Sequence, residues 1–327
     1  MGHGHFRAFL FSILMALVLS EAAYADDPIV SEETTSCIEC HASLNPGIVA
    51  DWKKSRMSRT TPSKAKGMPA RERRVSFSDL PGALGDFAVG CAECHTLNPE
   101  KHKDSFEHNG VKVHVVVTPQ DCATCHPVEK DQFGKNKMYH AYGNLSANPL
   151  YHDLVRSATG VQQFKDGKTV LKDPDPETLR EACFHCHGTL VNVKGTITKT
   201  TDHGDMAFPV LSGWPNQGVG RINPDGSKGA CTACHTRHQF AIEMARKPYT
   251  CSQCHKGPDV PAYKVYEVSK HGNIMASMGK GYEFGPVPWT VGKDFTAPAC
   301  AACHVSLLAS EDGDVLAERT HQMNDRL

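Results

Sequence analysis

The stretch CFHCHG at residues 183–188 contains two cysteines separated by two residues and followed at once by a histidine. The same Cys-x-x-Cys-His box occurs six more times along the 327-residue chain. The seven boxes begin at residues 37, 91, 122, 183, 231, 251 and 300. Together they use all fourteen cysteines of the sequence. One sequence pattern therefore accounts for the whole cysteine content of the protein.

This box is the covalent attachment signal of a c-type haem. Its two thiols can reach the two vinyl groups on one porphyrin edge, because residues i and i+3 of a helical turn face the same way. The histidine then lies under the ring, where its imidazole binds the iron. The predicted attachment residues are Cys37, Cys40, Cys91, Cys94, Cys122, Cys125, Cys183, Cys186, Cys231, Cys234, Cys251, Cys254, Cys300 and Cys303. The predicted iron ligands within the boxes are His41, His95, His126, His187, His235, His255 and His304.

Two other uses of the boxes fit the sequence less well. A structural zinc site usually pairs two Cys-x-x-Cys units, but seven units cannot pair off, and the histidine after each box would have no role. Seven short-range disulfides would leave the same histidines unexplained. The pattern therefore favours seven covalently attached haems.

Seven haems change the expected fold, because each porphyrin is a large apolar disc that replaces side-chain core. The hydrophobic content of 40% and the scarcity of alternating apolar patterns agree with this. We predict a mainly α fold with long loops, organised around a chain of closely packed haems. The spacing of the boxes is irregular, so an even repeat array is not expected. A soft boundary near residue 160 separates a three-haem region, 26–160, from a four-haem region, 161–327.

The first 25 residues have the features of a secretory signal peptide. A single arginine precedes a 13-residue apolar run, and an Ala-Tyr-Ala sequence follows, which predicts cleavage after Ala25. The run is short for a membrane span, although an uncleaved anchor is the alternative. We expect a periplasmic or otherwise exported protein with no stable membrane span after cleavage. The net charge of −1 gives no reason to expect nucleic-acid binding.

A haem that only transfers electrons takes a second axial ligand, whereas a haem that binds substrate keeps that position open. The best candidates for second ligands are His102, His108, His114, His140, His238, His271 and His321. His238 follows the fifth box so closely that it cannot reach round its own ring, so we expect it to serve a neighbouring haem. His152 is a weaker candidate, His185 is expected at the surface, and Met57 is an alternative ligand for an iron.

Local patterns place some elements around the boxes. DPDPETLREACFHCH, residues 173–187, predicts a turn and then a helix with an acidic start that delivers the fourth box. Residues 213–230 are rich in Gly, Pro and Asn and are expected to be irregular and to line a site. YKVYEVSKHG predicts a short helix that ends at Gly272 with His271 in its last turn.

Several stretches together resemble the hydroxylamine oxidoreductase-like family of multihaem cytochromes c. They are CIECHASLNPGIVADW, VGCAECH, TPQDCATCHPVE, GWPNQGVGRINPDGSKGACTACHTRH, CHKGPDVPAYKVYEVSKHG and APACAACHVS. The resemblance implies a largely helical, exported protein that oxidises hydroxylamine or hydrazine, or reduces nitrite or hydroxylamine. It also implies that the fourth haem along the chain is catalytic and that the others relay electrons.

Carried over to this sequence, the resemblance makes His187 the ligand of the catalytic iron. The segment after the fourth box then supplies candidate proton donors, Asp202, His203 and Asp205, and a candidate anion-orienting residue, Arg221. Two simpler readings stay open. Asp202, His203 and Asp205 could equally form an ordinary polar loop. Arg221 could equally bind a haem propionate.

This sequence departs from the family pattern at its end. Family members usually carry an eighth box and long C-terminal helices, which in the oxidative branch supply a cross-linking tyrosine, but the sequence ends with AERTHQMNDRL. We expect a truncated member, or one completed by another polypeptide. Its surplus histidine, His271 or His321, would then belong to the missing haem.

We expect the protein to reduce a small nitrogen compound, nitrite or hydroxylamine. It would receive electrons from a redox partner protein or a quinol-linked cytochrome. A homotrimer is a further expectation of the resemblance. The alternative is a non-catalytic electron-transfer cytochrome or a truncated, inactive relative.

Overall fold

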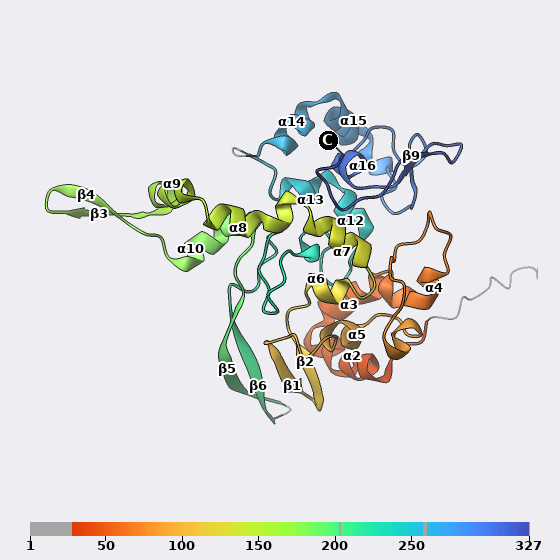
Figure 1. Ribbon diagram of the computed structural model, residues 1–327, viewed down its shortest axis with the longest axis horizontal. Helices are drawn as coiled ribbons and strands as arrows, with labels where there is room; N and C mark the ends of the chain where they lie inside the picture. The colour runs from red at the N-terminus through yellow and green to blue at the C-terminus, as the bar shows by residue number, and fades with distance from the viewer. Residues whose placement is uncertain (1–27, 203, 258–259, 327) are drawn as a thin grey trace, which may run out of the picture.

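The computed structural model describes residues 28–202, 204–257 and 260–326. The predicted signal peptide and His203 lie outside the described residues. Fifteen α-helices form the bulk of the described regular structure, and the longest, α2, has 13 residues (Figure 1). The helices are α2 (Glu32–Leu44), α3 (Pro46–Lys54), α4 (Pro62–Lys66), α5 (Cys91–His95), α6 (Pro119–Cys122), α7 (Pro127–Gly134), α8 (Ala141–Ser146), α9 (Pro149–Thr159), α10 (Pro176–Glu181), α11 (Cys183–His187), α12 (Ile242–Arg246), α13 (Pro248–Ser252), α14 (Ala262–Val268), α15 (Lys270–Met278) and α16 (Cys300–His304). The predicted mainly α fold with long loops is confirmed.

Proline and short polar side chains start many of these helices. Seven of them have proline in the first turn, where its missing N–H costs no hydrogen bond. Ser31 caps α2 by accepting from the N–H of Thr34 at 3.2 Å. Asp175 caps α10 in the same way, from the N–H of Thr178 at 2.8 Å. Frequent starts and stops keep the helices short, so the chain changes direction often.

Three of the boxes form a complete single helical turn of their own. They are α5, α11 and α16, each running from the first cysteine to the histidine of its box. The first box lies inside α2, and the fifth begins a 3-10 turn at Cys231–Ala233. The predicted helix before the fourth box is present as α10, which ends one residue before α11 begins.

The strands form small, separate sheets. The antiparallel hairpins are β1 (Ser105–His108) with β2 (Val111–His114), β3 (Val161–Lys165) with β4 (Lys168–Lys172), and β5 (Asn192–Thr201) with β6 (Gly204–Ser212). A three-stranded sheet combines β7 (Trp289–Thr290), β8 (Leu308–Ala309) and β9 (Val315–Ala317). The β5–β6 hairpin lies beside β1–β2, where the rings of Phe106 and Phe208 are 5.6 Å apart (Figure 1).

The helix expected to end at Gly272 is divided in the structure. Helix α14 stops at Val268, and α15 begins at Lys270, so His271 lies in a first turn rather than a last one. Ser269 is extended, with φ −73° and ψ 166°, and its side chain accepts from the N–H of Gly272 at 3.2 Å. This cap favours a new helix over continuation of the old one, so the single-helix prediction is wrong.

A compact aromatic core lies in the C-terminal part of the chain. It consists of Phe284, Trp289, Phe295, Ala299 and Ala302, with Trp289 completely buried. The Nε1–H of Trp289 donates to the carbonyl of Glu283 at 2.8 Å, which satisfies the one polar atom of the side chain. None of the described helices is both long enough and apolar enough to cross a membrane.

Candidate haem-binding cavity

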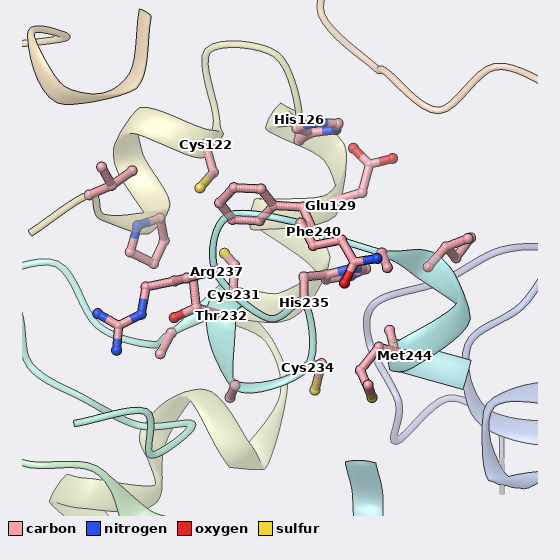
Figure 2. Close-up of a pocket in the computed structure, with 18 of the residues that line it drawn as sticks. Cys122, His126, Glu129, Cys231, Thr232, Cys234, His235, Arg237, Phe240 and Met244 are labelled. Carbon is pink, nitrogen blue, oxygen red and sulfur yellow. The ribbon is translucent and has the colours of Figure 1, made fainter. Parts of the chain in front are cut away.

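A single cavity of about 2560 Å³ runs through the molecule, and residues from all seven boxes line it. A pocket for one drug-sized ligand is typically about 300–1,000 Å³. Figure 2 shows the part between the third and fifth boxes, where Cys122, His126, Cys231, Cys234 and His235 face the same space. The volume and the lining are those expected of a shared space for several large groups.

Boxes that are distant in sequence are neighbours in this cavity. All fourteen cysteines are free thiols. Four side-chain hydrogen bonds join thiols of different boxes, and they pair Cys37 with Cys91, Cys122 with Cys231, Cys186 with Cys254, and Cys251 with Cys300. The contact with Cys254 lowers the pKa of Cys186 to about 6. The first and second, third and fifth, fourth and sixth, and sixth and seventh boxes are therefore adjacent.

Several box histidines are oriented by an oxygen acceptor at Nδ1. A carbonyl oxygen only accepts hydrogen bonds, so the facing Nδ1 must carry the proton, and Nε2 is then free to bind a metal. The Nδ1–O distances are 2.8 Å from His95 to His114, 3.2 Å from His187 to Ala141, 3.4 Å from His304 to Met323 and 2.9 Å from His41 to the side-chain oxygen of Asn45. This is the tautomer that haem iron requires.

Burial keeps other box histidines neutral. It lowers the pKa of His235 to about 4, with a further contribution from the nearby His126. Burial also lowers the pKa values of His95 and His126. Metal ligation needs the neutral imidazole, so the interior favours the form that binds iron.

Three predicted second ligands lie close to a box histidine. The ring centres are 6.0 Å apart for His41 and His108, 6.0 Å for His95 and His114, and 6.4 Å for His235 and His321. Two imidazoles on opposite sides of one metal ion, each with a metal–nitrogen bond of about 2.0 Å, have ring centres about 6 Å apart. All three pairs therefore match the spacing of histidines that share an iron, and the assignment of His108, His114 and His321 as ligands stays a prediction.

His238 extends from the fifth box toward the second. Burial, together with the nearby His95 and Arg237, lowers the pKa of His238 to about 4. Its side chain also lines the cavity. This position agrees with the expectation that His238 serves a neighbouring haem, and its ligand role stays a prediction.

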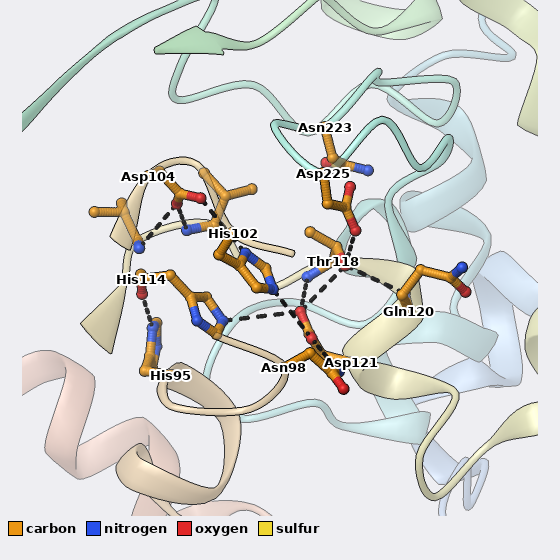
Figure 3. Close-up of polar contacts among 12 residues, drawn as sticks. His95, Asn98, His102, Asp104, His114, Thr118, Gln120, Asp121, Asn223 and Asp225 are labelled. Carbon is orange, nitrogen blue, oxygen red and sulfur yellow. Dashed lines mark hydrogen bonds and ion pairs between the residues drawn. The ribbon is translucent and has the colours of Figure 1, made fainter. Parts of the chain in front are cut away.

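The remaining predicted second ligands occupy different environments. His271 lines the cavity from the first turn of α15. His140 is exposed, and its Nε2 lies 3.1 Å from the carbonyl oxygen of Gly134. His102 stacks on His114 at 3.5 Å and faces Asp104 and Asp121 (Figure 3). His185 is exposed, as expected, and the weaker candidate His152 is exposed as well.

The Gly, Pro and Asn-rich segment after the hairpin packs tightly on the fourth box. The Asn216 side chain accepts from the N–H groups of Thr189 and Gly218, at 3.2 and 2.9 Å, and donates to the carbonyl of Phe184 at 3.0 Å. A Cβ on Gly218 would collide with the backbone of Gly188, so only glycine permits this approach. The segment is irregular and lines the cavity, as its composition predicted.

Arg221 is held in this segment with 1% of its surface exposed. Its Nε donates to Asn223 at 2.7 Å and its Nη1 to the carbonyl of Asn216 at 2.8 Å. Burial lowers the pKa of Arg221 to about 10, and the neighbouring Arg237 adds to the effect. Both guanidinium groups lie over the ring of Trp214, at 5.1 and 4.9 Å, and both line the cavity. Together they supply concentrated positive charge that suits an anion.

The predicted proton donors are not brought to the fourth box. Asp202 and Asp205 are exposed beside the turn between β5 and β6, and Asp205 accepts from the Thr200 hydroxyl at 2.7 Å. Neither residue lines the cavity around His187. His203 lies outside the described residues. The catalytic roles of these three residues stay predictions from the resemblance.

Two arginines in the cavity wall were not predicted: Arg74, which is half-buried, and Arg246, which is buried. Arg74 donates to the carbonyl of Gly285 at 2.8 Å, and Arg246 donates to those of Phe284 and Pro286 at 2.8 and 2.6 Å. The Nε atoms of both are buried without a partner in the described part of the chain. Burial lowers the pKa values of both groups, with a further contribution from Arg56 at Arg74 and from Arg74 at Arg246. Such unneutralised cations fit the propionates of haem, and no local sequence pattern distinguishes them.

Comparison with known proteins supports the same conclusion. A family model described as "Seven times multi-haem cytochrome CxxCH" matches residues 222–318. A solved structure described as a hypothetical multihaem protein is 49% identical, with a TM-score of 0.86, and the match covers 93% of this chain and 58% of that one. A probable nitrite reductase–hydroxylamine oxidoreductase fusion protein of Kuenenia stuttgartiensis is 24% identical over 292 residues.

The chain is a multihaem cytochrome related to the hydroxylamine oxidoreductase-like proteins. A solved reducing HAO-like protein complex of Kuenenia stuttgartiensis shares the fold, with 23% identity and a TM-score of 0.50 over 84% of this chain and 42% of that one. The fusion protein match covers 85% of this multihaem cytochrome but only 26% of the relative. The multihaem cytochrome thus spans about a quarter of that relative and about half of the solved ones. Its cofactor is covalently bound haem c, as predicted.

Proposed function

We propose that this protein is an exported seven-haem cytochrome c that reduces a small nitrogen compound, nitrite or hydroxylamine. The reaction takes place at the fourth box, and the other six boxes relay electrons to it. Bound haem c supplies the iron that exchanges electrons and binds the nitrogen compound. The signal peptide, the cleavage after Ala25 and the division near residue 160 belong to the same proposal.

The observation that carries the proposal is the convergence of all seven boxes on one cavity. The thiol contacts between boxes mean that groups attached to them lie next to one another. A connected series of this kind can collect several electrons, and the reduction of nitrite or hydroxylamine at a single centre consumes several. Zinc sites or short disulfides would need no such shared space.

The nitrogen chemistry and its direction are inferred from the relatives. One is described as a nitrite reductase–hydroxylamine oxidoreductase fusion, and another as a reducing HAO-like protein complex. The second description also supports a redox partner protein. A quinol-linked cytochrome as electron donor and assembly into a homotrimer rest on the resemblance of the sequence.

The residues of this chain have separate roles in the proposal. His187 would hold the iron through Nε2, because the carbonyl of Ala141 accepts its Nδ1–H at 3.2 Å and fixes the ring. Arg221, with Arg237, supplies the positive charge that attracts and orients an anion. Proton donation by Asp202, His203 and Asp205 rests on the resemblance alone.

A second candidate function is electron transfer without catalysis. The His41–His108, His95–His114 and His235–His321 pairs favour it for three of the boxes, because an iron with two histidine ligands has no open position. A chain in which every iron has two protein ligands would carry electrons only. The two functions therefore differ in the coordination of the fourth haem.

Low-temperature electron paramagnetic resonance on the fully haem-loaded protein separates the two functions. The reductase predicts a high-spin ferric signal that changes when nitrite or hydroxylamine is added. Arg221→Gln should weaken the nitrite response while leaving the haem content unchanged, and the exposed Lys228→Gln is a matched charge control. Seven low-spin haems with no response to either compound would rule out the reductase and leave the carrier.

A further inference from the structure

A strongly basic segment lies between the first two boxes, outside every haem attachment site. This segment, residues 53–74, has the sequence KKSRMSRTTPSKAKGMPARERR. It contains nine lysines and arginines and one glutamate, so its net charge is +8 in a chain whose net charge is −1. The positive charge of the protein is therefore concentrated in this basic segment, and the remainder of the chain is acidic.

Buried neighbours hold the basic segment in an ordered shape. It runs from the end of α3 through a 3-10 turn, Met57–Arg59, into α4 (Figure 1). The N–H of Ser58 donates to the hydroxyl of the buried Ser55 at 3.1 Å. Thr61 caps α4 by accepting from the N–H of Lys64 at 3.2 Å. The cations therefore project from a defined surface and not from a free tail.

Most of the exposed charge in this segment is not neutralised. The exposed cations are Lys53, Lys54, Arg56, Arg59 and Lys64. Lys54 lies 3.5 Å from Asp51, in an exposed ion pair of the kind that contributes little. Arg59 donates to the carbonyl of Lys54, which leaves its charge uncompensated. The side chains of Lys53, Arg56 and Lys64 have no hydrogen bond or ion pair among the described residues. A surface with this surplus of positive charge attracts an anionic partner.

The same cations border the haem cavity. Four of the five, all except Lys53, line it. Helix α3, which ends at Lys54, packs against α2, which carries the first box. Cys40 of that box is exposed, so the attachment point itself lies at the surface. Electron tunnelling falls steeply with distance, so a carrier held by the basic segment is placed to exchange electrons with this end of the series.

The chemistry of the basic segment favours a transient protein partner over a lipid surface or a permanent subunit. The exposed large hydrophobic side chains of the described chain include Ile48 and Val111 but none between them. Membrane-surface elements combine basic residues with an apolar face, and permanent interfaces are rich in apolar contacts. Complementary charge without apolar contact instead speeds the encounter of partners that must also separate. An electron carrier that delivers its electron and leaves has this requirement.

We propose that the basic segment docks an acidic one-electron carrier protein at the first-box end of the haem series. In each encounter the carrier loses one electron, one ferric haem of this chain becomes ferrous, and no bond is formed or broken. The inference rests on the proposed redox partner protein, and it names the surface and the charge by which that partner is recognised. It does not depend on which nitrogen compound is reduced.

Stopped-flow reduction of the full-length, haem-loaded ferric protein tests this surface. Reduced plant-type two-iron ferredoxin, an acidic one-electron carrier, serves as the probe, and haem absorbance reports the electron transfer. Charge steering raises association rates by about 10–10³-fold and is screened by salt. We therefore expect the second-order rate constant to fall about tenfold or more from about 0.01 M to about 0.5 M salt. Lys53→Glu with Arg59→Glu and Lys64→Glu should lower it about tenfold or more at low salt, with the haem content and the reductive titration unchanged.

The matched control carries the same change of charge elsewhere. Lys165→Glu with Lys168→Glu and Lys172→Glu alters the β3–β4 hairpin, where all three lysines are exposed and lie outside the cavity lining. We expect its rate constant to change by less than about threefold. Equal losses in both triple variants would overturn the proposal, because net charge alone would then explain them. A wild-type rate constant that does not depend on salt would also overturn it.

Two further outcomes would reassign the cations. A changed haem content or reductive titration in the first triple variant would assign them to haem propionates and overturn the docking surface. Wild-type binding to phosphatidylserine vesicles that this variant loses, with unchanged ferredoxin kinetics, would assign them to a lipid surface and overturn it as well. If the triple variant fails to fold, Lys53→Glu alone decides, because Lys53 is exposed and does not line the cavity. Its rate constant should fall about threefold at low salt, and an unchanged rate constant would overturn the proposal.

Discussion

The aromatic core and the haem cavity solve the same packing problem in different ways. In the core, the rings of Trp289 and Phe295 are 4.3 Å apart, and Phe284 packs on Trp289 at 5.6 Å. Across the cavity, the box histidines line one shared space of about 2560 Å³, and the Nε atoms of Arg74 and Arg246 have no partner among the described residues. Folded interiors are close-packed, so the second region is complete only with its cofactors. The chain thus packs partly on itself and partly on groups that it must acquire.

Removing one haem should have the largest effect. Cys231→Ala with Cys234→Ala removes the attachment site of the fifth box, which lies deep in the cavity beside the third (Figure 2). We expect one haem fewer and a loss of unfolding free energy above about 5 kcal/mol, because the void exceeds any left by a single side chain. Denaturant unfolding with haem quantification measures this. An unchanged free energy of unfolding would mean that the cavity walls are stable without this haem.

Truncating the aromatic core should have the next largest effect. Trp289→Ala leaves a void among the described core side chains and should cost about 3–5 kcal/mol while leaving the haem content unchanged. The control is Val268→Ala, because Val268 is 77% exposed and its truncation should change stability by less than about 0.5 kcal/mol. Loss of haem from Trp289→Ala would show that the core and the cavity are not separate.

Removing one second ligand should alter the spectrum of one haem and leave the fold intact. His321→Gly opens the position facing His235, so one additional high-spin ferric signal should appear and added imidazole should reverse it. Electron paramagnetic resonance measures the change. The matched control is His152→Gly, because His152 is exposed and does not line the cavity. A spectrum identical to wild type would remove His321 from the ligand set.

The smallest predicted effect concerns an ion pair at the cavity wall. Burial raises the pKa of Glu129, but the Ser76 hydroxyl at 2.5 Å and Arg319 at 2.8 Å outweigh it, and the net pKa is lowered. The ionised form therefore stabilises the fold above the unfolded pKa near 4.5, and this stability is lost as pH falls through the lower, folded pKa.

Glu129→Gln should accordingly lose about 1–3 kcal/mol at pH 7, and the difference from wild type should shrink below about pH 4.5. Denaturant unfolding at several pH values measures this. The exposed Glu177→Gln is the control. A difference that stays constant down to pH 3 would contradict the lowered pKa.

The sequence predicted what depends on local chemistry. The spacing of each box specified a helical turn with a ligand at its end, and the structure forms such turns at α5, α11 and α16. Asp175 and the proline after it correctly predicted the start of α10. These features are determined within a few residues, so one sequence contains the necessary information.

Features that depend on distant contacts were not predicted. His41 of α2 meets His108 of β1 through a long-range contact that no local sequence pattern specifies. The length of the β5–β6 pairing determines where Asp202 and Asp205 lie, and that pairing carries them to an exposed turn. Helix α14 stops after Val268 because Ser269 caps α15 instead of continuing the helix. The sequence pattern alone also fits one continuous helix. In each case a tertiary contact, or competition between local signals, decides the outcome.

The contacts between thiols of different boxes have a consequence for how the protein is made. Cys122 and Cys231 meet although 109 positions separate them in the chain, and Cys186 meets Cys254. In an oxidising compartment, a chain that closed before maturation would cross-link these partners and lose its vinyl-reactive groups. We infer that the haems are attached to the cysteines before the chain folds. Peptide mapping of protein from haem-starved cells should reveal Cys122–Cys231 cross-links, and their absence would refute this order of assembly.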